Sequence, residues 1–197
     1  MKHHFFHYMD RVIQNRWNDV AFADYGENLQ YTHGEVAQQI ERFHKLFRQM
    51  GINEGDKIAI ASRNCSNWVV SYMAILSYKA VAVTLLQDFK ADDLARLIKH
   101  SDAKMLFVGP FVWRELQHQE LPVLDAIISM DDFSFIHLAE SHKGKVEQIM
   151  QEESTLSENT FFSLVKDGKI DLDSMALINY TSGSTGSPKG VMISHRS

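Results

Sequence analysis

The sequence contains very little cysteine and no concentration of positive charge. Cys65 is the single cysteine among 197 residues, which excludes an internal disulfide and a zinc site built from cysteines. Lysine and arginine number 20 against 25 acidic residues, so the formal net charge is −5, and no basic block rises above the background. A nucleic-acid-binding protein is therefore not expected. The scarcity of cysteine also fits a reducing compartment, and we expect a cytoplasmic protein.

A metal-binding pattern and a secretion signal are also missing. None of the ten histidines belongs to an HExxH motif. His3, His4 and His7 cluster near the N-terminus but lack a carboxylate at ligand spacing, so no histidine metal site is expected. The opening stretch MKHHFFHYMDR has no apolar run ahead of Asp10 and Arg11, and a secretory signal is therefore not expected either.

One long hydrophobic run raises the question of a membrane span. Residues 68–86 (WVVSYMAILSYKAVAVTLL) are nearly apolar and long enough to cross a bilayer as a helix. Lys79 lies inside this run, and a lysine at the centre of a membrane helix costs roughly 2.5–3.5 kcal/mol on insertion scales. A buried helix followed by a buried strand explains the run better, so no transmembrane segment is expected.

Strands and helices alternate along most of the chain, which has 45% hydrophobic and 23% charged residues and can therefore bury a core. The alternation predicts an α/β fold with a mostly parallel, doubly wound sheet and flanking helices. Residues 131–145 show no periodicity and are interpreted as a loop. Expected strands cover Val20–Ala23, Leu29–Tyr31, Lys57–Ala61, Ala80–Leu85, Lys104–Val108, Val123–Ser129 and Met175–Asn179. Expected helices cover the first fifteen residues, 33–50, Asn67–Tyr78, Ala91–His100, Val146–Glu153 and Asn159–Lys166.

The clearest local signals mark the two ends of the helix expected over residues 33–50. Thr32 and Glu35 form a capping box, in which a threonine N-cap is followed three residues later by glutamate. Gly51 follows the last apolar residue of the helix, at a position where a left-handed backbone favours glycine.

The stretch YTSGSTGSPKG, residues 180–190, concentrates glycine, hydroxyl groups and one lysine between two apolar runs. Gly183, Gly186 and Gly190 are expected to adopt positive φ and to let the backbone approach a ligand closely. Successive backbone amides can then converge on phosphate oxygens, and Lys189 supplies one full positive charge. Hydroxyl donors come from Thr181, Ser182, Ser184 and Thr185. The loop is therefore predicted to bind an anionic group.

The spacing of this loop excludes two common phosphate-binding motifs. Counted from Gly183, the glycine position of a Walker A loop holds Pro188, and the serine or threonine position holds Gly190. The loop does not contain the GxGxxG spacing of a dinucleotide-binding site either. A solvated linker is a weaker interpretation, because linkers rarely hold a lone lysine between proline and glycine and between two apolar runs.

YTSGSTGSPKGV closely resembles the phosphate-binding signature of the adenylate-forming (AMP-binding) superfamily, which includes acyl-CoA synthetases, adenylation domains of peptide synthetases and luciferases. The residues after it, MISHRS, are similar to the family as well. Upstream, residues 29–35 (LQYTHGE) resemble the family element L-T-Y-x-E-L, and residues 51–60 resemble G-V-x-x-G-D-x-V-A-I. The sequence departs from the family at Lys79 and Thr84, where glycine and proline are usual.

The resemblance implies an enzyme that activates a carboxylic acid with ATP and Mg²⁺, giving an acyl-adenylate and pyrophosphate, and then transfers the acyl group to a thiol, usually coenzyme A. Carried over by motif, Thr181 is expected near the magnesium ion. No catalytic residue is assigned within the chain, and the role of His195 is left open. The residues expected to bind the nucleotide phosphates are Thr181, Ser182, Gly183, Ser184, Thr185, Gly186 and Lys189.

The resemblance also implies that residues 1–197 form the N-terminal part of an AMP-binding domain. In the family, the acid-binding pocket and the C-terminal domain with its catalytic lysine lie beyond the phosphate loop, so this chain alone is expected to be inactive. Sheet surface left uncovered by that missing part suggests a homodimer. The final segment SHRS is interpreted as the start of a helix.

The substrate is expected to be a long-chain fatty acid, because VMISHRS and SGSTGSPKG look most like bacterial long-chain fatty acid–CoA ligases. An amino-acid-adenylating domain would carry the same loop. A non-catalytic nucleotide-binding module is a further alternative.

Overall fold

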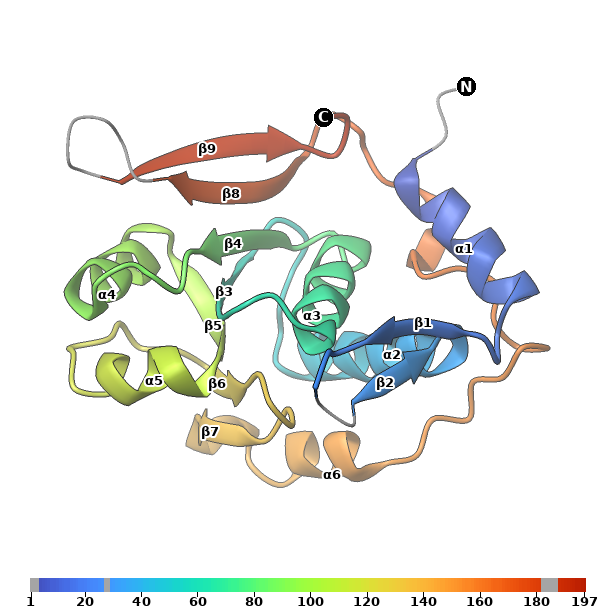
Figure 1. Ribbon diagram of the computed structural model, residues 1–197, viewed down its shortest axis with the longest axis horizontal. Coiled ribbons are helices and arrows are strands. Elements are labelled where there is room, and N and C mark those ends of the chain that lie inside the picture. The colour runs from blue at the N-terminus through green and yellow to red at the C-terminus, as the bar shows by residue number, and fades with distance from the viewer. Residues whose placement is uncertain (1–3, 27–28, 182–187) are drawn as a thin grey trace.

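Strands and helices alternate in the computed structural model, which describes residues 4–26, 29–181 and 188–197 (Figure 1). The helices are α1 (Phe5–Asn15), α2 (His33–Gln49), α3 (Ser66–Ser77), α4 (Ala91–His100), α5 (Pro110–Leu116) and α6 (Lys145–Gln151). The strands are β1 (Val20–Ala23), β2 (Gln30–Thr32), β3 (Lys57–Ala61), β4 (Val81–Leu85), β5 (Ala103–Val108), β6 (Ala126–Ser129), β7 (Phe135–Leu138), β8 (Met175–Thr181) and β9 (Lys189–Ser194). Short 3₁₀ turns cover Glu140–His142 and Lys166–Gly168.

The main sheet of the described residues has the strand order β7-β6-β5-β3-β4-β8-β9. Strands β6, β5, β3, β4 and β8 run parallel, whereas β7 and β9 pair antiparallel at the two edges. The predicted α/β fold with a mostly parallel sheet and flanking helices is confirmed. Because the five central strands are parallel, their carboxyl ends lie at one edge of the sheet.

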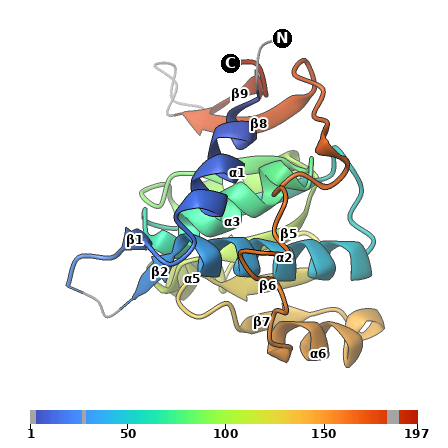
Figure 2. The same cartoon turned by 90° about the vertical axis from the view of Figure 1, so that its right-hand side faces the viewer.

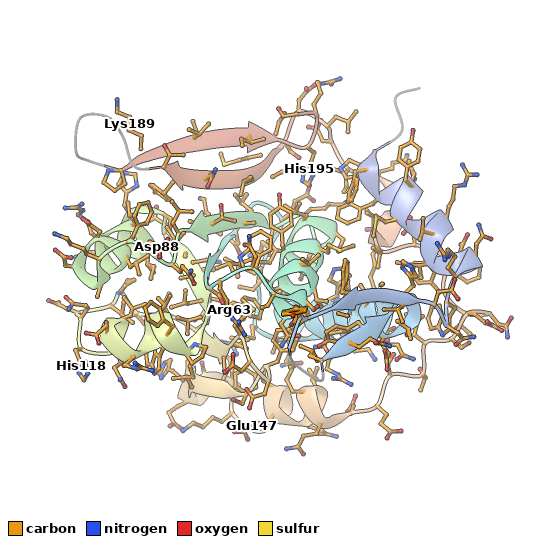
Figure 3. All side chains as sticks on the ribbon, in the orientation of Figure 1. Arg63, Asp88, His118, Glu147, Lys189 and His195 are labelled. Atoms are coloured by element: carbon orange, nitrogen blue, oxygen red, sulfur yellow. The ribbon has the colours of Figure 1, made fainter. Side chains whose placement is uncertain are left out.

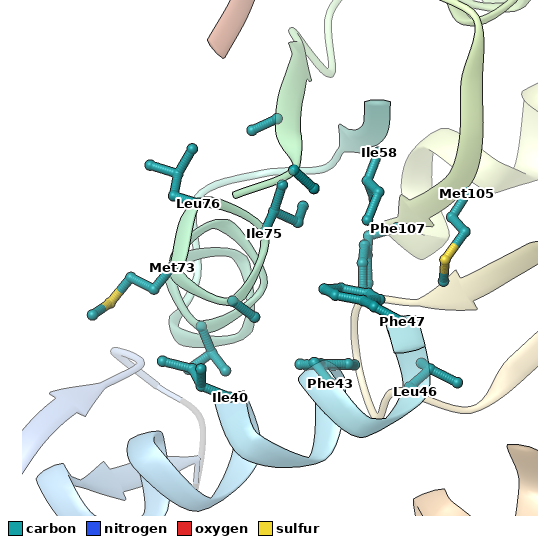
Figure 4. Packing of buried hydrophobic residues seen from close by; sticks show 14 of the residues in the cluster. Ile40, Phe43, Leu46, Phe47, Ile58, Met73, Ile75, Leu76, Met105 and Phe107 are labelled. Carbon is teal, nitrogen blue, oxygen red and sulfur yellow. The ribbon is translucent and has the colours of Figure 1, made fainter. Parts of the chain in front are cut away.

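Helices cover both faces of this sheet. Ile58 and Ile60 of β3 pack into a core shared with α2 and α3, and Figure 4 shows the aromatic and aliphatic side chains that fill it. Ala59 and Ala61 of the same strand belong to a second core shared with α4 and α5. Alternate residues of one strand therefore enter different cores, as the twofold period of a strand requires.

Helix α2 begins and ends as the sequence predicts. The Glu35 amide donates to Oγ1 of Thr32 over 3.2 Å, and the Thr32 amide donates to Oε2 of Glu35 over 2.7 Å, which completes the capping box. Gly51 has a φ of 72° just beyond the last turn.

The start of α3 is capped from a distance. Cys65 makes no side-chain hydrogen bond at the N-cap, but Oδ1 of Asp24 accepts from both the amide and the hydroxyl of Ser66 over 2.8 Å each. Asp24 directly follows β1, so the two-stranded sheet β1–β2 fixes the N-terminal end of α3.

The hydrophobic run at residues 68–86 forms most of α3 and all of β4, as expected. No helix in the described part of the chain is long and apolar enough to span a membrane. Lys79 has a φ of 67° between the two elements, and the Lys79 and Ala80 amides donate to the carbonyls of Leu76 and Ile75. This is the C-terminal arrangement that favours glycine, the residue that the resemblance to the family implies at the position of Lys79.

The chain between residues 110 and 174 differs most from the sequence prediction. Helix α5, which Pro110 opens, and strand β7 inside the supposed loop were not predicted, and the strand expected at Val123–Ser129 begins only at Ala126. The local sequence of β7 carries no clear alternation of apolar and polar residues. The strand forms because it pairs with the edge of β6, a tertiary contact that the local sequence does not reveal.

The prediction of a helix at Asn159–Lys166 is wrong. The structure has no α-helix there, and only Lys166 belongs to a short 3₁₀ turn. Buried Asp10 of α1 accepts from the Leu164 amide and from the Ser163 hydroxyl, over 2.7 Å each. These bonds hold the segment against α1 in an irregular conformation and replace the hydrogen bonds of a helix. The helix expected at Val146–Glu153 is confirmed as α6.

Candidate functional site

The predicted phosphate loop joins the two strands of an antiparallel hairpin. Strand β8 ends at Thr181, β9 begins at Lys189, and these two residues pair directly across the hairpin. Directly opposed residues of an antiparallel pair project from the same face. The Thr181 hydroxyl and the Lys189 ammonium therefore lie on one face at the mouth of the loop, and both residues are exposed.

Most of the loop itself lies outside the described residues. The phosphate contacts predicted for Ser182, Gly183, Ser184, Thr185 and Gly186 thus stay predictions.

The magnesium contact predicted for Thr181 also stays a prediction. Across the described ranges, no three histidine, cysteine, aspartate or glutamate side chains gather as metal ligands. The donors present at the mouth of the loop, one hydroxyl and one ammonium, fit the oxygens of a phosphate group.

Tyr180, the residue before Thr181, fastens the hairpin to α4. Its side chain is only 2% exposed, and its hydroxyl lies 2.7 Å from Nδ1 of His100 at the end of α4. Burial raises the pKa of the Tyr180 phenol, which keeps the hydroxyl protonated and able to donate to the imidazole. The chain is therefore fixed one residue before the loop begins.

Gly190 differs from the sequence prediction, which gave it positive φ and a close approach to a ligand. It lies within β9 and does not have positive φ. A Cβ built on Gly190 would lie 3.1 Å from Cε1 of Tyr180 and 3.2 Å from Cγ2 of Ile178. Gly190 thus leaves room for the ring of its cross-strand partner Tyr180, and it contributes to the packing between strands β8 and β9.

A cavity of about 460 Å³ lies beside the hairpin at the carboxyl edge of the sheet. This edge cavity is lined by residues 62–64 after β3, residues 84–88 at the end of β4, Trp68 and Tyr72 of α3, and Leu177 and Asn179 of β8. Leu177, Asn179 and Thr181 alternate along β8 and so share one face. The edge cavity and the mouth of the loop therefore lie on the same face of β8, where open α/β sheets bind their ligands.

The wall of the edge cavity combines polar and aromatic groups. Oγ1 of Thr84 donates to Oδ1 of Asn179 over 3.1 Å, which links the ends of β4 and β8. Trp68 and Tyr72 stack with their ring centroids 5.1 Å apart. Thr84, at which the sequence departs from the family, thus makes a polar contact that proline could not make.

Sequence reasoning missed two charged residues of this cavity, Arg63 and Asp88, which Figure 3 labels below the hairpin. Arg63 follows β3 and Asp88 follows β4, at the edge where parallel strands end. The position of charged residues directly after expected parallel strands was the signal that could have identified them.

His195, whose role the sequence left open, lies at the opposite end of β9 from Lys189 (Figure 3). It contacts His4 of the N-terminal segment, and its Nδ1 lies 3.2 Å from Nε2 of His4. His195 and Arg196 form a turn after β9 in place of the helix start that the sequence suggested. His195 is therefore not part of the mouth of the loop.

Curated relatives match this chain over most of its length. A long-chain-fatty-acid–[acyl-carrier-protein] ligase of Arabidopsis thaliana is 26% identical over 185 residues, which are 85% of this chain and 24% of the relative. A medium-chain fatty-acid–CoA ligase of Escherichia coli is 26% identical over 207 residues, 92% of this chain and 34% of the relative. The chain thus spans about a quarter to a third of the length of these two proteins.

Solved structures share the fold. The anthranilate CoA ligase AuaEII in complex with anthranoyl-AMP aligns with a TM-score of 0.74 at 19% identity, over 98% of this chain and 35% of that chain. The coronafacic acid ligase from Pectobacterium brasiliense aligns with a TM-score of 0.73 at 21% identity, over the same shares of the two chains. Residues 9–197 match the family described as AMP-binding enzyme, and the chain therefore belongs to the AMP-binding enzyme family.

Proposed function

We propose that this chain forms the phosphate-binding part of an ATP-dependent acid–CoA ligase. The observation that carries the proposal is the register of hairpin β8–β9, which brings Thr181 and Lys189 to one face at the mouth of the loop. The same face of β8 borders the edge cavity, so a nucleotide phosphate and a second substrate could lie side by side there. The Tyr180–His100 contact holds this arrangement on the body of the protein.

The residues at the loop would act on the triphosphate of ATP. When the acid attacks the α-phosphate, negative charge develops on the departing pyrophosphate. Lys189 would neutralise part of that charge, and hydroxyls and amides of residues 181–186 would donate hydrogen bonds to the same oxygens. Magnesium, when bound, would add charge neutralisation, with the Thr181 hydroxyl among its contacts.

We infer that the acid is a fatty acid, with a long acyl chain as the first candidate. The support comes from the names of the two curated relatives, a long-chain and a medium-chain fatty-acid ligase. The names give an acyl-carrier protein as the thiol acceptor for one relative and CoA for the other. We propose CoA because the chain resembles bacterial fatty acid–CoA ligases at its phosphate loop.

We expect the 197-residue chain alone not to form acyl-adenylate, because it spans only about a third of the E. coli ligase it resembles. An ATP–pyrophosphate exchange assay with purified chain and a series of fatty acids tests this expectation. Robust exchange would show that the chain contains all the groups needed for adenylation and would overturn the expectation.

Phosphate binding itself can be tested on the chain by titration calorimetry with magnesium pyrophosphate. Lys189→Ala removes the charged contact and should weaken binding by about 1.5–3 kcal/mol, which is about 10- to 150-fold in Kd. Lys189→Arg should recover part of the loss, because it keeps the charge.

The matched control is Lys145→Ala, which removes an exposed lysine from α6, on the other side of the molecule from the hairpin (Figure 1). Equal Kd values for Lys189→Ala and Lys145→Ala would refute a phosphate-binding role for the hairpin.

A further inference from the structure

The N-terminal helix meets the base of hairpin β8–β9. Helix α1 runs from the hairpin towards the sheet β1–β2, and its first turn lies beside the end of β9 (Figures 1 and 2). The contact is made by His4, the N-cap residue of α1, and His195, the first residue after β9. Nε2 of His4 and Nδ1 of His195 lie 3.2 Å apart, and the ring centroids are 5.2 Å apart.

Hydrogen bonding fixes the tautomer of both rings. The Phe6 amide donates to Nδ1 of His4 over 3.2 Å, so this nitrogen is an acceptor and carries no proton. The proton of a neutral His4 is then on Nε2, which donates to Nδ1 of His195. Nδ1 of His195 is therefore also unprotonated, and the proton of this second ring is on Nε2.

A third proton on the pair would break the arrangement. Protonated His4 would carry hydrogen on Nδ1, where it would face the donating amide of Phe6. Protonated His195 would carry hydrogen on Nδ1, where it would face the donating Nε2 of His4. Nε2 of His195 is already buried with no hydrogen-bond partner among the described residues, so no acceptor there favours the charged ring. The geometry requires both imidazoles to be neutral.

The charged groups around the pair do not offset this requirement. His7 and Asp10 of α1 act on His4 with opposite signs, and Asp171 before β8 acts on His195. Arg196, next in the chain, is paired with Asp173 in an exposed ion pair of 2.6 Å.

Burial outweighs the nearby carboxylates at both rings. It lowers the pKa of His4, with His7 adding to the effect. Burial and the neighbouring His4 lower the pKa of His195 to about 4. Both rings therefore favour the neutral state that the hydrogen bonds require.

We propose that His4 and His195 form a proton-sensitive tie that holds the N-terminal helix against the base of the phosphate-loop hairpin. Well above pH 6.5 both imidazoles are neutral in the tied and in the released state, and the tie holds. As the pH falls below 6.5, the released histidines take up protons that the tied pair excludes. The ratio of tied to released protein then falls about tenfold per pH unit for each histidine that must stay neutral.

The tie also acts on the loop at the other end of β9. Strand β9 is the edge strand of the sheet and pairs only with β8 among the described strands. Release of His195, the first residue after β9, would loosen the register that brings Lys189 opposite Thr181. His4 and His195 are therefore positioning residues for the loop, and this consequence rests on the proposed function, whereas the tie itself does not.

The tautomers can be observed directly by long-range ¹H–¹⁵N correlation spectra of the full chain. We expect His4 and His195 both to be protonated at Nε2 at pH 7.5, and His195 to titrate far below pH 6.5. A proton on Nδ1 of His195, or an ordinary titration near pH 6.5, would overturn the proposal.

Two variants separate the tie from the helix cap. His4→Asn keeps a side-chain acceptor for the Phe6 amide, because asparagine is a favoured N-cap, but lacks the ring nitrogen that reaches His195. His195→Asn places an amide oxygen where Nδ1 stood, so it can still accept from His4 and cannot be protonated. His118→Gln removes an exposed histidine elsewhere and serves as the control.

The readout is hydrogen-exchange protection of the α1 amides at pH 7.5 and 5.5, corrected for intrinsic rates and referred to the core strand β3. In the wild type and in His118→Gln we expect protection of the α1 amides to fall at the lower pH. The fall should be about tenfold if one histidine must stay neutral and about a hundredfold if both must. In His195→Asn, protection of the α1 amides should fall by at most about tenfold, because only His4 can still take up a proton. His4→Asn should already be poorly protected at pH 7.5. Equal protection of wild type and His4→Asn, or no change with pH in the wild type, would overturn the tie.

The link to the loop has its own measurement. Magnesium pyrophosphate affinity of the wild type should fall from pH 7.5 to 5.5 by a larger factor than that of His195→Asn. The same pH dependence in both would overturn the link to the loop. Absence of binding at every pH, with the exchange result as expected, would count against the proposed function and leave the tie supported.

Discussion

The central strands and hairpin β8–β9 belong to one sheet but differ in how deeply their side chains are buried and in how far helices cover them. Every residue of β3 except Lys57 is buried, whereas the first four residues of β9 are exposed, among them Met192 at 70%. The central strands are covered by helices on both faces, and β9 lies at an edge. Apolar burial thus specifies the central strands and the helices that cover them, here called the frame, whereas the polar groups of the candidate site lie at an exposed edge. Changes in the two regions should therefore affect different properties.

Loss of an aromatic side chain from the core should have the largest effect on stability. Phe43 is fully buried, and its ring packs edge-on against Phe107 and Phe133, with centroid distances of 5.2 and 4.8 Å. We expect Phe43→Ala to lower the free energy of unfolding by about 3–5 kcal/mol, measured by urea titration. Phe162→Ala, at a residue that is 79% exposed, should change it by less than about 0.5 kcal/mol. Similar losses for both would contradict the division into frame and edge.

Acid should weaken the frame through His44. This ring is 2% exposed, and its Nε2 lies 3.1 Å from the Ala74 carbonyl and 2.9 Å from Oγ of Ser77. Burial lowers the pKa of His44 to about 4, against 6.5 in the unfolded chain. Because the unfolded state binds the proton more tightly, stability is fully present above pH 6.5 and is lost as the pH falls towards 4.

The expected loss from His44 approaches about 3 kcal/mol at pH 4, since each pKa unit corresponds to about 1.4 kcal/mol. Urea titrations between pH 7.5 and 4 measure it, and His44→Gln should reduce the pH dependence because glutamine does not titrate. An unchanged slope in His44→Gln would show that other groups cause the acid sensitivity.

A side chain at Gly190 should disturb the hairpin without affecting the frame. The added atom would come within 3.1–3.3 Å of the Tyr180 ring, so the ring must shift. We expect Gly190→Val to cost about 1–3 kcal/mol in thermal unfolding and to perturb the Tyr180–His100 contact. Val191→Ala, at the next and exposed position, should be nearly neutral. A fully stable Gly190→Val protein would show that the packing of Tyr180 does not require glycine.

The smallest expected effect is a gain in stability at Lys79. A left-handed backbone costs a non-glycine residue about 1–2 kcal/mol, and glycine gives back about 0.5–1 kcal/mol through its freedom in the unfolded chain. We therefore expect Lys79→Gly to raise the free energy of unfolding by about 0.5–1 kcal/mol. Lys79→Ala keeps the strained backbone and removes the charge that lies 3.9 Å from Glu54, so it should give no gain. An equal gain for both variants would assign the effect to charge.

The sequence was sufficient for the parts of the fold that local chemistry determines. The capping box at Thr32 and the glycine at position 51 predicted both ends of α2, and apolar runs predicted the central strands. It was insufficient where tertiary contacts decide. Strand β7 depends on its pairing with β6, and Asp10 holds residues 163–164 in an irregular conformation in place of a helix.

The same division applies to the candidate site. The motif predicted that the loop lies between two apolar runs, and in the structure Thr181 and Lys189 pair directly at the two ends of that loop. Their contacts with phosphate stay predictions. The motif could not show that Gly190 packs against Tyr180, nor that Arg63 and Asp88 lie in the neighbouring cavity. Those relations come from the parallel arrangement of β3, β4 and β8, which brings residues distant in sequence to one edge.

The most direct test of phosphate binding by the loop is a crystal structure. The crystals would be grown from the protein in the presence of magnesium and a non-hydrolysable ATP analogue. We predict that the β- and γ-phosphate oxygens lie within hydrogen-bonding distance of Nζ of Lys189 and the hydroxyl of Thr181, next to the edge cavity. Phosphates bound elsewhere, for example in the larger cavity of about 570 Å³ between α2, α6 and the turn before β7, would contradict the assignment of the loop.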